Sequence, residues 1–257
     1  ANQLIQKNIN VGIISKGYKS NYSNPREVLT SSAAQDVGDE PLLIKTKVDC
    51  PVFVGKKRFL TGDHLLKLYP KTQIILSDDG LQHYSLFRDY EFLLVDGTRH
   101  FGNQRLIPTG PLREPLSRLE KADAIISIDD NGKLKISAAN TVKSICDDQL
   151  ISINGKRKIN FSSIRHKNLV AFTAIANPDK FFRTLTLKQL NFKKAIFDDH
   201  YNFTQSDFDD YQDMYIVLTE KDAIKCAHIK HNNLWVASIS LKIDADLINE
   251  MLIKVGL

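Results

Sequence analysis

A short apolar run that ends abruptly in polar residues limits what this chain can fold into. Residues 74–76 are Ile, Ile and Leu, and the chain continues with Ser77, Asp78, Asp79 and Gly80. Such a run is typical of a buried parallel strand, whose carboxyl end carries polar side chains to the ligand-binding edge of an α/β sheet. Aspartates at that edge could hold Mg²⁺ on a nucleotide phosphate, whereas the same aspartates could simply cap the next helix.

Four other strands are predicted, at residues 10–15, 50–55, 90–95 and 122–126, and each also ends in, or is followed by, polar or glycine residues. Because the carboxyl ends of parallel strands share one edge, we expect all five strands to form one sheet with a nucleotide-type site at that edge. Residues 1–8 look like the end of a helix with no strand before it. We therefore expect the first βα unit of this parallel-sheet domain to be missing.

Composition excludes several classes of protein. The 257 residues are 42% hydrophobic, without a signal peptide or an apolar run of the roughly 20 residues that span a bilayer. We therefore expect a chain that neither spans a membrane nor is secreted.

Three cysteines without metal-ligand spacing indicate a reducing compartment. The net charge of +5 favours anionic partners, but no basic stripe alternates with aromatic residues, so nucleic acid is not expected.

The order of elements predicts two α/β domains. Residues 1–128 would form the larger core domain. Residues 129–168 are polar, carry turn signals at 130–132 and 154–155, and read as a hairpin-like linker. Residues 169–233 would form a second, smaller α/β domain, and residues 234–257 a returning strand and a final helix.

Several polar residues lie where chemistry could occur. Asp39 and Glu40 would begin a helix at Pro41, where the positive end of the helix favours carboxylates, although both could be ordinary caps. Arg113 and Glu114 lie in a proline-rich loop at residues 101–119 and could clamp a phosphate or form a surface pair.

A set of motifs carries a family resemblance. Together they resemble tetraacyldisaccharide 4'-kinase, the lipid A 4'-kinase, over nearly the whole chain; they lie at residues 37–44, 77–83, 88–89, 95–97, 101–103, 108–115, 199–200 and 218–223. The resemblance implies a P-loop-kinase-like α/β domain with a smaller α/β domain joined by a β-ribbon. It also implies transfer of the ATP γ-phosphate to the 4'-hydroxyl of an acylated glucosamine disaccharide 1-phosphate. The implied location is the cytoplasmic face of a Gram-negative inner membrane, with peripheral contact to the membrane surface.

The resemblance also implies roles for individual residues. Asp39 and His200 would pair to activate the sugar hydroxyl, with Arg113 and Glu114 near the reacting phosphate. A carboxylate that orients an imidazole makes a sound general base for an alcohol. The remaining roles would be Mg²⁺ binding by Asp78, Asp79 and Glu40, nucleotide binding by Asp79 and Gly80, and substrate contact by Tyr18, Arg58, Gln82 and His83.

The chain also departs from the family pattern. We find neither the glycine-rich Walker A loop with its Lys and Thr nor the hydrophobic helix that precedes it. Since that loop cradles the phosphates, we expect this chain to be a fragment that is inactive alone. Smaller departures, at Lys16, Ala174 and Lys180, concern lipid contacts. Two alternatives stay open: a non-catalytic remnant that binds the acylated disaccharide, and a metal-dependent hydrolase that uses no nucleotide.

Overall fold

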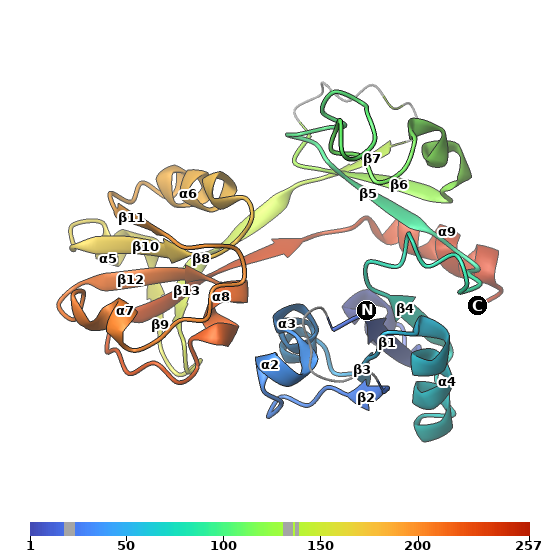
Figure 1. Ribbon diagram of the computed structural model, residues 1–257, viewed down its shortest axis with the longest axis horizontal. Helices are drawn as coiled ribbons and strands as arrows, with labels where there is room; N and C mark the ends of the chain where they lie inside the picture. Colours follow the sequence, from blue (N-terminus) through green and yellow to red (C-terminus); the bar gives the residue numbers. More distant parts are fainter. Residues whose placement is uncertain (18–23, 131–135, 137–138) are drawn as a thin grey trace. The chain divides into compact units, whose positions relative to one another are not determined.

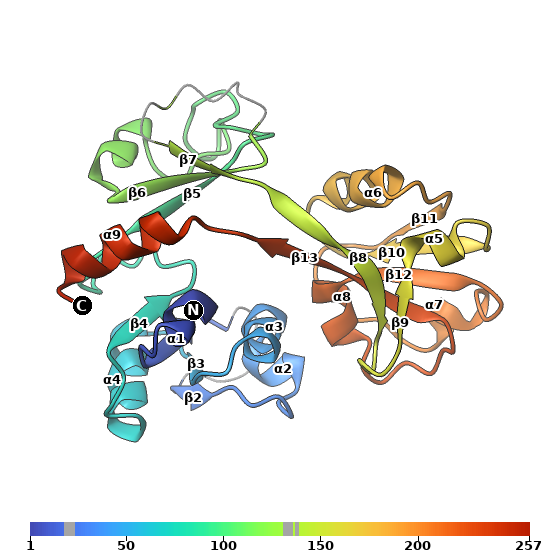
Figure 2. The same cartoon turned by 180° about the vertical axis from the view of Figure 1, so that it is seen from behind.

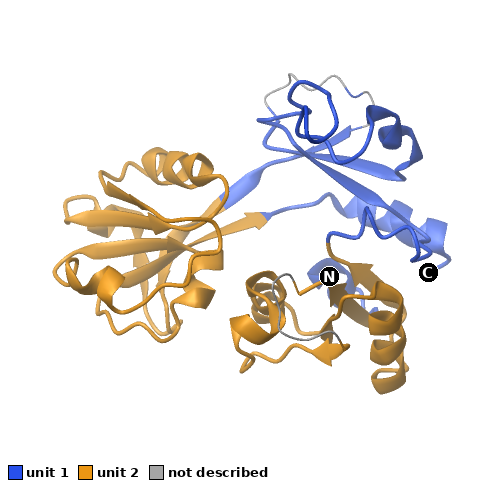
Figure 3. Ribbon diagram, in the orientation of Figure 1, with its two compact units in different colours: residues 1–9, 79–145, 241–257 blue, residues 10–78, 146–240 orange. Residues whose placement is uncertain are grey.

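The computed structural model describes residues 1–17, 24–130, 136 and 139–257 (Figure 1). Contacts divide these residues into two units (Figure 3). The first unit contains residues 1–9, 79–145 and 241–257, and the second contains residues 10–78 and 146–240. Within the described residues, no helix is both long enough and apolar enough to cross a membrane.

The second unit contains a four-stranded sheet in the order β2-β3-β1-β4. Its strands are β1 (Val11–Ser15), β2 (Arg26–Glu27), β3 (Val52–Val54) and β4 (Ile74–Ser77). Strands β3 and β4 run parallel to β1, which confirms the parallel strand predicted at residues 74–76. Strand β4 is only partly buried, because it ends the sheet and pairs with β1 alone among the described strands.

Three helices accompany this sheet: α2 (Ala34–Val37), α3 (Asp39–Lys47) and α4 (Arg58–Leu68). The helix predicted from Pro41 is present and begins two residues earlier, so that Asp39 and Glu40 lie in its first turn. Helix α4 begins at Arg58, so Gly62 lies inside it. Leu65 of α4 is fully buried against the sheet.

The first unit contains a parallel sheet in the order β5-β6-β7. Its elements are α1 (Asn2–Gln6), β5 (Phe92–Asp96), the 3₁₀ helix η1 (Leu116–Lys121), β6 (Ala124–Ile128), β7 (Ala139–Val142) and α9 (Ala245–Val255). Of the five predicted strands, β1, β3 and β4 pair within the second unit, and β5 and β6 pair within this one. Strand pairing is made between distant segments, and a polar carboxyl end does not specify the partner. Strand β7 also pairs here, although we expected it in the linker.

A six-stranded sheet in the order β11-β10-β12-β13-β8-β9 completes the second unit. Its strands are β8 (Ser144–Ser152), β9 (Lys158–Asn160), β10 (Leu169–Thr173), β11 (Lys193–Ile196), β12 (Tyr215–Thr219) and β13 (Leu234–Leu241). Strands β8 and β9 form the predicted antiparallel hairpin around Gly155 (Figure 2). The other turn signal, at residues 130–132, lies largely outside the described residues.

Helices cover both faces of this sheet. Along β10, Leu169 and Ala171 pack with α5 (Phe161–Ile164) and α6 (Pro178–Leu187), while Val170 and Phe172 pack with α7 (Ser206–Asp209). Alternate residues of a strand face opposite sides, so both sides of β10 are apolar. Helix α8 (Glu220–Lys225) follows β12 directly, and its N-cap is Thr219. Residues 169–233, predicted as a second α/β domain, supply three strands of this sheet (β10, β11 and β12), while β8, β9 and β13 come from the segments on either side.

Candidate active site

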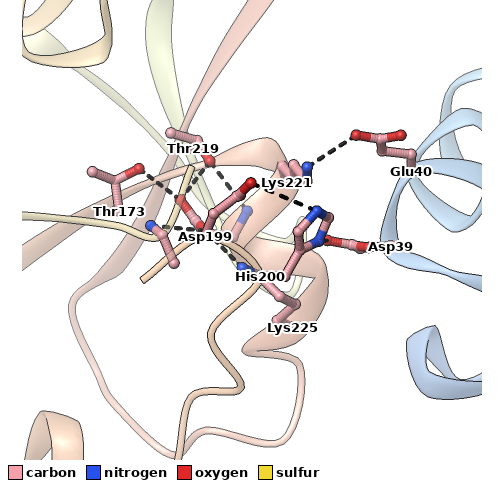
Figure 4. A network of polar contacts seen from close by, with 10 residues as sticks. Asp39, Glu40, Thr173, Asp199, His200, Thr219, Lys221 and Lys225 are labelled. Atoms are coloured by element: carbon pink, nitrogen blue, oxygen red, sulfur yellow. Dashed lines mark hydrogen bonds and ion pairs between the residues drawn. The ribbon is translucent and has the colours of Figure 1, made fainter. Parts of the chain in front are cut away.

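Asp39 and His200 meet although they are far apart in sequence. Nδ1 of His200 lies 3.1 Å from Oδ2 of Asp39, and the side chains are 17% and 13% exposed (Figure 4). Asp39 is the first residue of α3, and His200 lies in the loop that follows β11. On the other side of the ring, Nε2 of His200 lies 3.8 Å from a carboxylate oxygen of Asp199. The expected pairing is confirmed, and its catalytic role stays a prediction.

Local backbone geometry places Asp39 at the start of its helix. Gly38 connects α2 to α3 with φ 90° and ψ 147°, a conformation that residues with a side chain rarely adopt. The turn directs the Asp39 carboxylate to the amino end of α3, where the helix dipole stabilises negative charge. His200 also has a positive φ, of 63°, which is uncommon for a non-glycine residue.

A second contact joins the same helix to α8. Nζ of Lys221 donates to Oε1 of Glu40 at 2.9 Å, and Lys47 pairs with Glu220. Burial alone would lower the pKa of Lys221. The hydrogen bond to Glu40 and the charges of Glu40, Asp39 and Asp199 outweigh burial and raise this pKa above its ordinary value. The ammonium therefore stays charged beside the Asp39 carboxylate.

Polar groups also gather at the carboxyl ends of β1 and β4. The hydroxyl of Ser15 donates to Oδ2 of Asp78 at 2.9 Å, and Nη2 of Arg58 donates to the carbonyl of Asp78 at 2.5 Å. Arg58 was expected to touch substrate, but its side chain points inward and the residue is 3% exposed. In this structure Arg58 holds the turn that carries Asp78, so direct contact between Arg58 and a substrate is not supported.

In the first unit, four predicted site residues lie close together. Nη1 of Arg113 lies 3.7 Å from the Asp79 carboxylate and 3.5 Å from Oε1 of Gln82. Gln82 donates to Glu114 at 3.3 Å, and Glu114 pairs with Arg118 at 3.4 Å. The side chains of Asp79 and Arg113 are 69% and 62% exposed. A phosphate clamp and a surface pair both remain compatible with this geometry.

The other predicted residues have simpler surroundings. The carbonyl of Gly80 accepts the N–H of His83 at 3.0 Å, and the carbonyl of His83 accepts from Arg88 at 3.1 Å. These contacts order the turn after β4 but do not test nucleotide or substrate binding. Tyr18 lies outside the described residues.

Comparison with known proteins places the chain in a family. The sequence profile of the tetraacyldisaccharide-1-P 4'-kinase family matches residues 1–256. The chain belongs to this family. A tetraacyldisaccharide 4'-kinase from Methylobacillus flagellatus is 38% identical over 252 residues, which are 98% of this chain and 74% of that protein. One from Francisella tularensis subsp. novicida is 38% identical over 254 residues, with 95% of this chain and 79% of that protein covered.

A solved structure shares the fold. The "apo" form of LpxK from Aquifex aeolicus in complex with ATP matches with a TM-score of 0.76, covering 98% of this chain and 81% of that one at 23% identity. The match confirms the mixed α/β fold class. As a member of the tetraacyldisaccharide 4'-kinase family, the chain belongs to the kinases.

The oxygen atoms at the carboxyl ends of β1 and β4 are of the kind that the expected Mg²⁺ would need. Mg²⁺ prefers oxygen ligands and usually takes only one or two protein carboxylates, with water and phosphate completing its shell. Ser15 and Asp78 offer a hydroxyl and a carboxylate that already lie within hydrogen-bonding distance. No group of three His, Cys, Asp or Glu side chains suited to a metal occurs in the described residues. Glu40, another expected ligand, is engaged by Lys221.

Reasoning from the sequence missed several residues around the site. No role was predicted for Lys221 or Asp222, although the Thr-Glu-Lys-Asp motif at residues 219–222 signals a capped helix. Arg118 was also missed. Its guanidinium donates to Glu91, and this hydrogen bond raises the pKa of Arg118.

Proposed function

We propose that this chain carries the site that transfers the γ-phosphate of ATP to the 4'-hydroxyl of an acylated glucosamine disaccharide 1-phosphate. The observation that carries this proposal is the 3.1 Å contact between His200 Nδ1 and Asp39 Oδ2. A carboxylate can only accept, so a neutral His200 that shares a hydrogen with Asp39 holds it on Nδ1. Nε2 then keeps the lone pair that takes the proton from the sugar hydroxyl.

Other residues bind and orient the reactants in this proposal. Asp78 and Ser15 hold Mg²⁺, while Asp79 and Gly80 contact the nucleotide and Arg113 contacts its phosphates. Bound Mg²⁺ neutralises charge on the phosphate oxygens. Gln82 and Glu114 keep Arg113 in place, because Gln82 contacts both side chains.

Phosphate transfer by the protein that carries residues 1–257 tests this proposal. Purified protein, γ-labelled ATP, Mg²⁺ and tetraacyldisaccharide 1-phosphate in detergent micelles should yield labelled lipid. His200→Gln should lose most of this activity. His166→Gln is the matched control, since His166 is an exposed loop residue, and should retain it.

Three other outcomes would overturn the proposal. Lipid binding without transfer by the wild type would favour a non-catalytic remnant. Phosphate release from a model ester without ATP would favour a metal-dependent hydrolase. Full activity of His200→Gln would remove the role assigned to the pair.

The same proposal places the protein at the cytoplasmic face of the Gram-negative inner membrane, as a peripheral protein. The net charge of +5 supports attraction to anionic lipid. Phe59 and Leu60 on α4 are 65% and 44% exposed, and they follow the exposed Lys56 and Lys57. Exposed apolar side chains next to lysines are typical of interfacial attachment. Co-sedimentation should be stronger with anionic than with zwitterionic vesicles, and equal binding to both would contradict the charge argument.

A further inference from the structure

Asp222 is a fully buried carboxylate in the first turn of α8. Its Oδ2 accepts from the hydroxyls of Thr173 at 3.0 Å and Thr219 at 2.7 Å. Its Oδ1 accepts from the backbone N–H of Ala174 at 3.2 Å and lies 3.0 Å from Nζ of Lys225. Burying a charge is costly unless the charge is paired and hydrogen-bonded. These contacts satisfy the carboxylate and join the carboxyl ends of β10 and β12 to α8 (Figure 4).

The same contacts lead to His200. The N–H of Ala174 is bound by Asp222, and the carbonyl of Ala174 accepts the N–H of His200 at 3.2 Å. The left-handed backbone of His200 costs of the order of 1 kcal/mol and persists only where surrounding contacts impose it. The bond from Ala174 is such a contact. Asp222 therefore supports the backbone that points the imidazole at Asp39.

Asp222 also supports the second contact of the site. Its own N–H donates to Oγ1 of Thr219 at 3.1 Å, which caps α8. Lys221, the preceding residue, projects from the same turn to Glu40. One buried carboxylate thus anchors both groups that reach the first turn of α3: the imidazole that meets Asp39 and the ammonium that meets Glu40.

We propose that Asp222 is a positioning residue that holds His200 against Asp39 and Lys221 against Glu40. Its catalytic consequence rests on the proposed kinase function, but the positioning itself does not. An ordinary helix cap would require only the reciprocal bonds between Asp222 and Thr219. It would not require the bonds from Thr173, the last residue of β10, and from Ala174, which follows it; these residues lie 49 and 48 positions earlier in the chain.

The test uses paired variants, because removing Asp222 alone would leave Lys225 buried without its partner. The side chain of Lys225 is only 6% exposed. In Asp222→Ala/Lys225→Met both charges are removed, and the acceptor for Ala174 is lost. In Asp222→Asn/Lys225→Met both charges are also removed, but the amide oxygen can still accept from Ala174.

Two measurements report on positioning. The first is the ¹⁵N NMR signal of the His200 imidazole in the 257-residue chain, assigned through His200→Gln. The second is kcat, with KM for ATP, in the protein that is used for the transfer assay. In Asp222→Ala/Lys225→Met the imidazole signal should move to the value seen in Asp39→Ala. Its kcat should fall about 10- to 100-fold, as expected for a displaced catalytic group, while KM for ATP stays within twofold. The Asn variant should restore the signal and most of kcat.

Leu185→Ala is the control for a general loss of stability. Leu185 is fully buried on the opposite face of the six-stranded sheet, so this variant should melt at a lower temperature without moving the His200 signal. The proposal is overturned if the imidazole signal is unchanged in the Ala variant, or if Leu185→Ala moves it equally. A moved signal with no phosphate transfer by the wild type supports the positioning role and rejects the kinase proposal instead.

Discussion

Nδ1 of His200 lies 3.1 Å from Oδ2 of Asp39, across 161 residues of sequence. Asp39 belongs to a helix beside the four-stranded sheet, and His200 belongs to a loop of the six-stranded sheet. The two residues are too far apart in sequence for local structure to bring them together. The pair therefore exists only when the two sheets of the second unit approach each other.

Substituting the pair should reveal whether its members act together. General-base assistance is worth a factor of about 10² to 10⁴, so His200→Gln and Asp39→Asn should each lower kcat by that order. The double variant should lose little more than the worse single variant, because groups that act as a unit are not additive. Steady-state kinetics of all four proteins check this, and multiplicative losses would show independent roles.

Asp78 offers a test of metal binding. Asp78→Asn keeps an oxygen that can accept from Ser15 but removes the charge that would attract Mg²⁺. The variant should need a higher Mg²⁺ concentration for half-maximal transfer and should recover part of its rate when Mg²⁺ is raised. Asp63→Asn removes an exposed carboxylate that pairs with Lys67 on α4 and serves as the control. Wild-type rates for Asp78→Asn at limiting Mg²⁺ would leave Asp78 a purely structural residue.

Local sequence patterns were sufficient to locate most elements of the second domain. The apolar run at residues 169–173 coincides with strand β10, and helix α6 begins at Pro178, because proline suits the first position of a helix. The sequence marks the interior of α4 less clearly, because glycine normally disfavours a helix interior. Gly62 is accommodated there between Ile75 and Ile14, which an added Cβ would approach to 3.7 and 4.0 Å.

Contacts between distant segments were not predictable in the same way. Which of the predicted strands pair with one another within each unit depends on distant segments, and that information is not local. Family resemblance supplied the pairing of Asp39 with His200, which spacing alone could not. The support from Asp222 was missed, because its partner Thr173 lies 49 residues away and no pattern marks the contact.

Gly38 should be sensitive to substitution. Gly38→Ala places a side chain at φ 90° and ψ 147°, and we expect a loss of about 1–3 kcal/mol in the free energy of unfolding. Gly62→Ala is the matched control in α4, where an added Cβ meets only ordinary contacts; it should be neutral or stabilise by up to about 1 kcal/mol. Urea unfolding of both variants measures this. Equal stability of Gly38→Ala and the wild type would contradict the backbone argument.

The thiol of Cys226 should make stability depend on alkaline pH. Burial raises the pKa of this fully buried thiol far above its ordinary value, and the charge of Asp222 adds to the effect. Below about pH 8.5 both the folded and unfolded states keep the proton, so this contribution is fully present. At higher pH only the unfolded thiol ionises, so the free energy of unfolding should fall by up to about 1.4 kcal/mol per pH unit. Urea unfolding between pH 7.5 and 10 gives the free energy of unfolding as a function of pH. In Cys226→Ala this free energy should fall less steeply with pH than in the wild type, by an amount that corresponds to about one proton. Identical slopes in the two proteins would show that the folded thiol ionises normally.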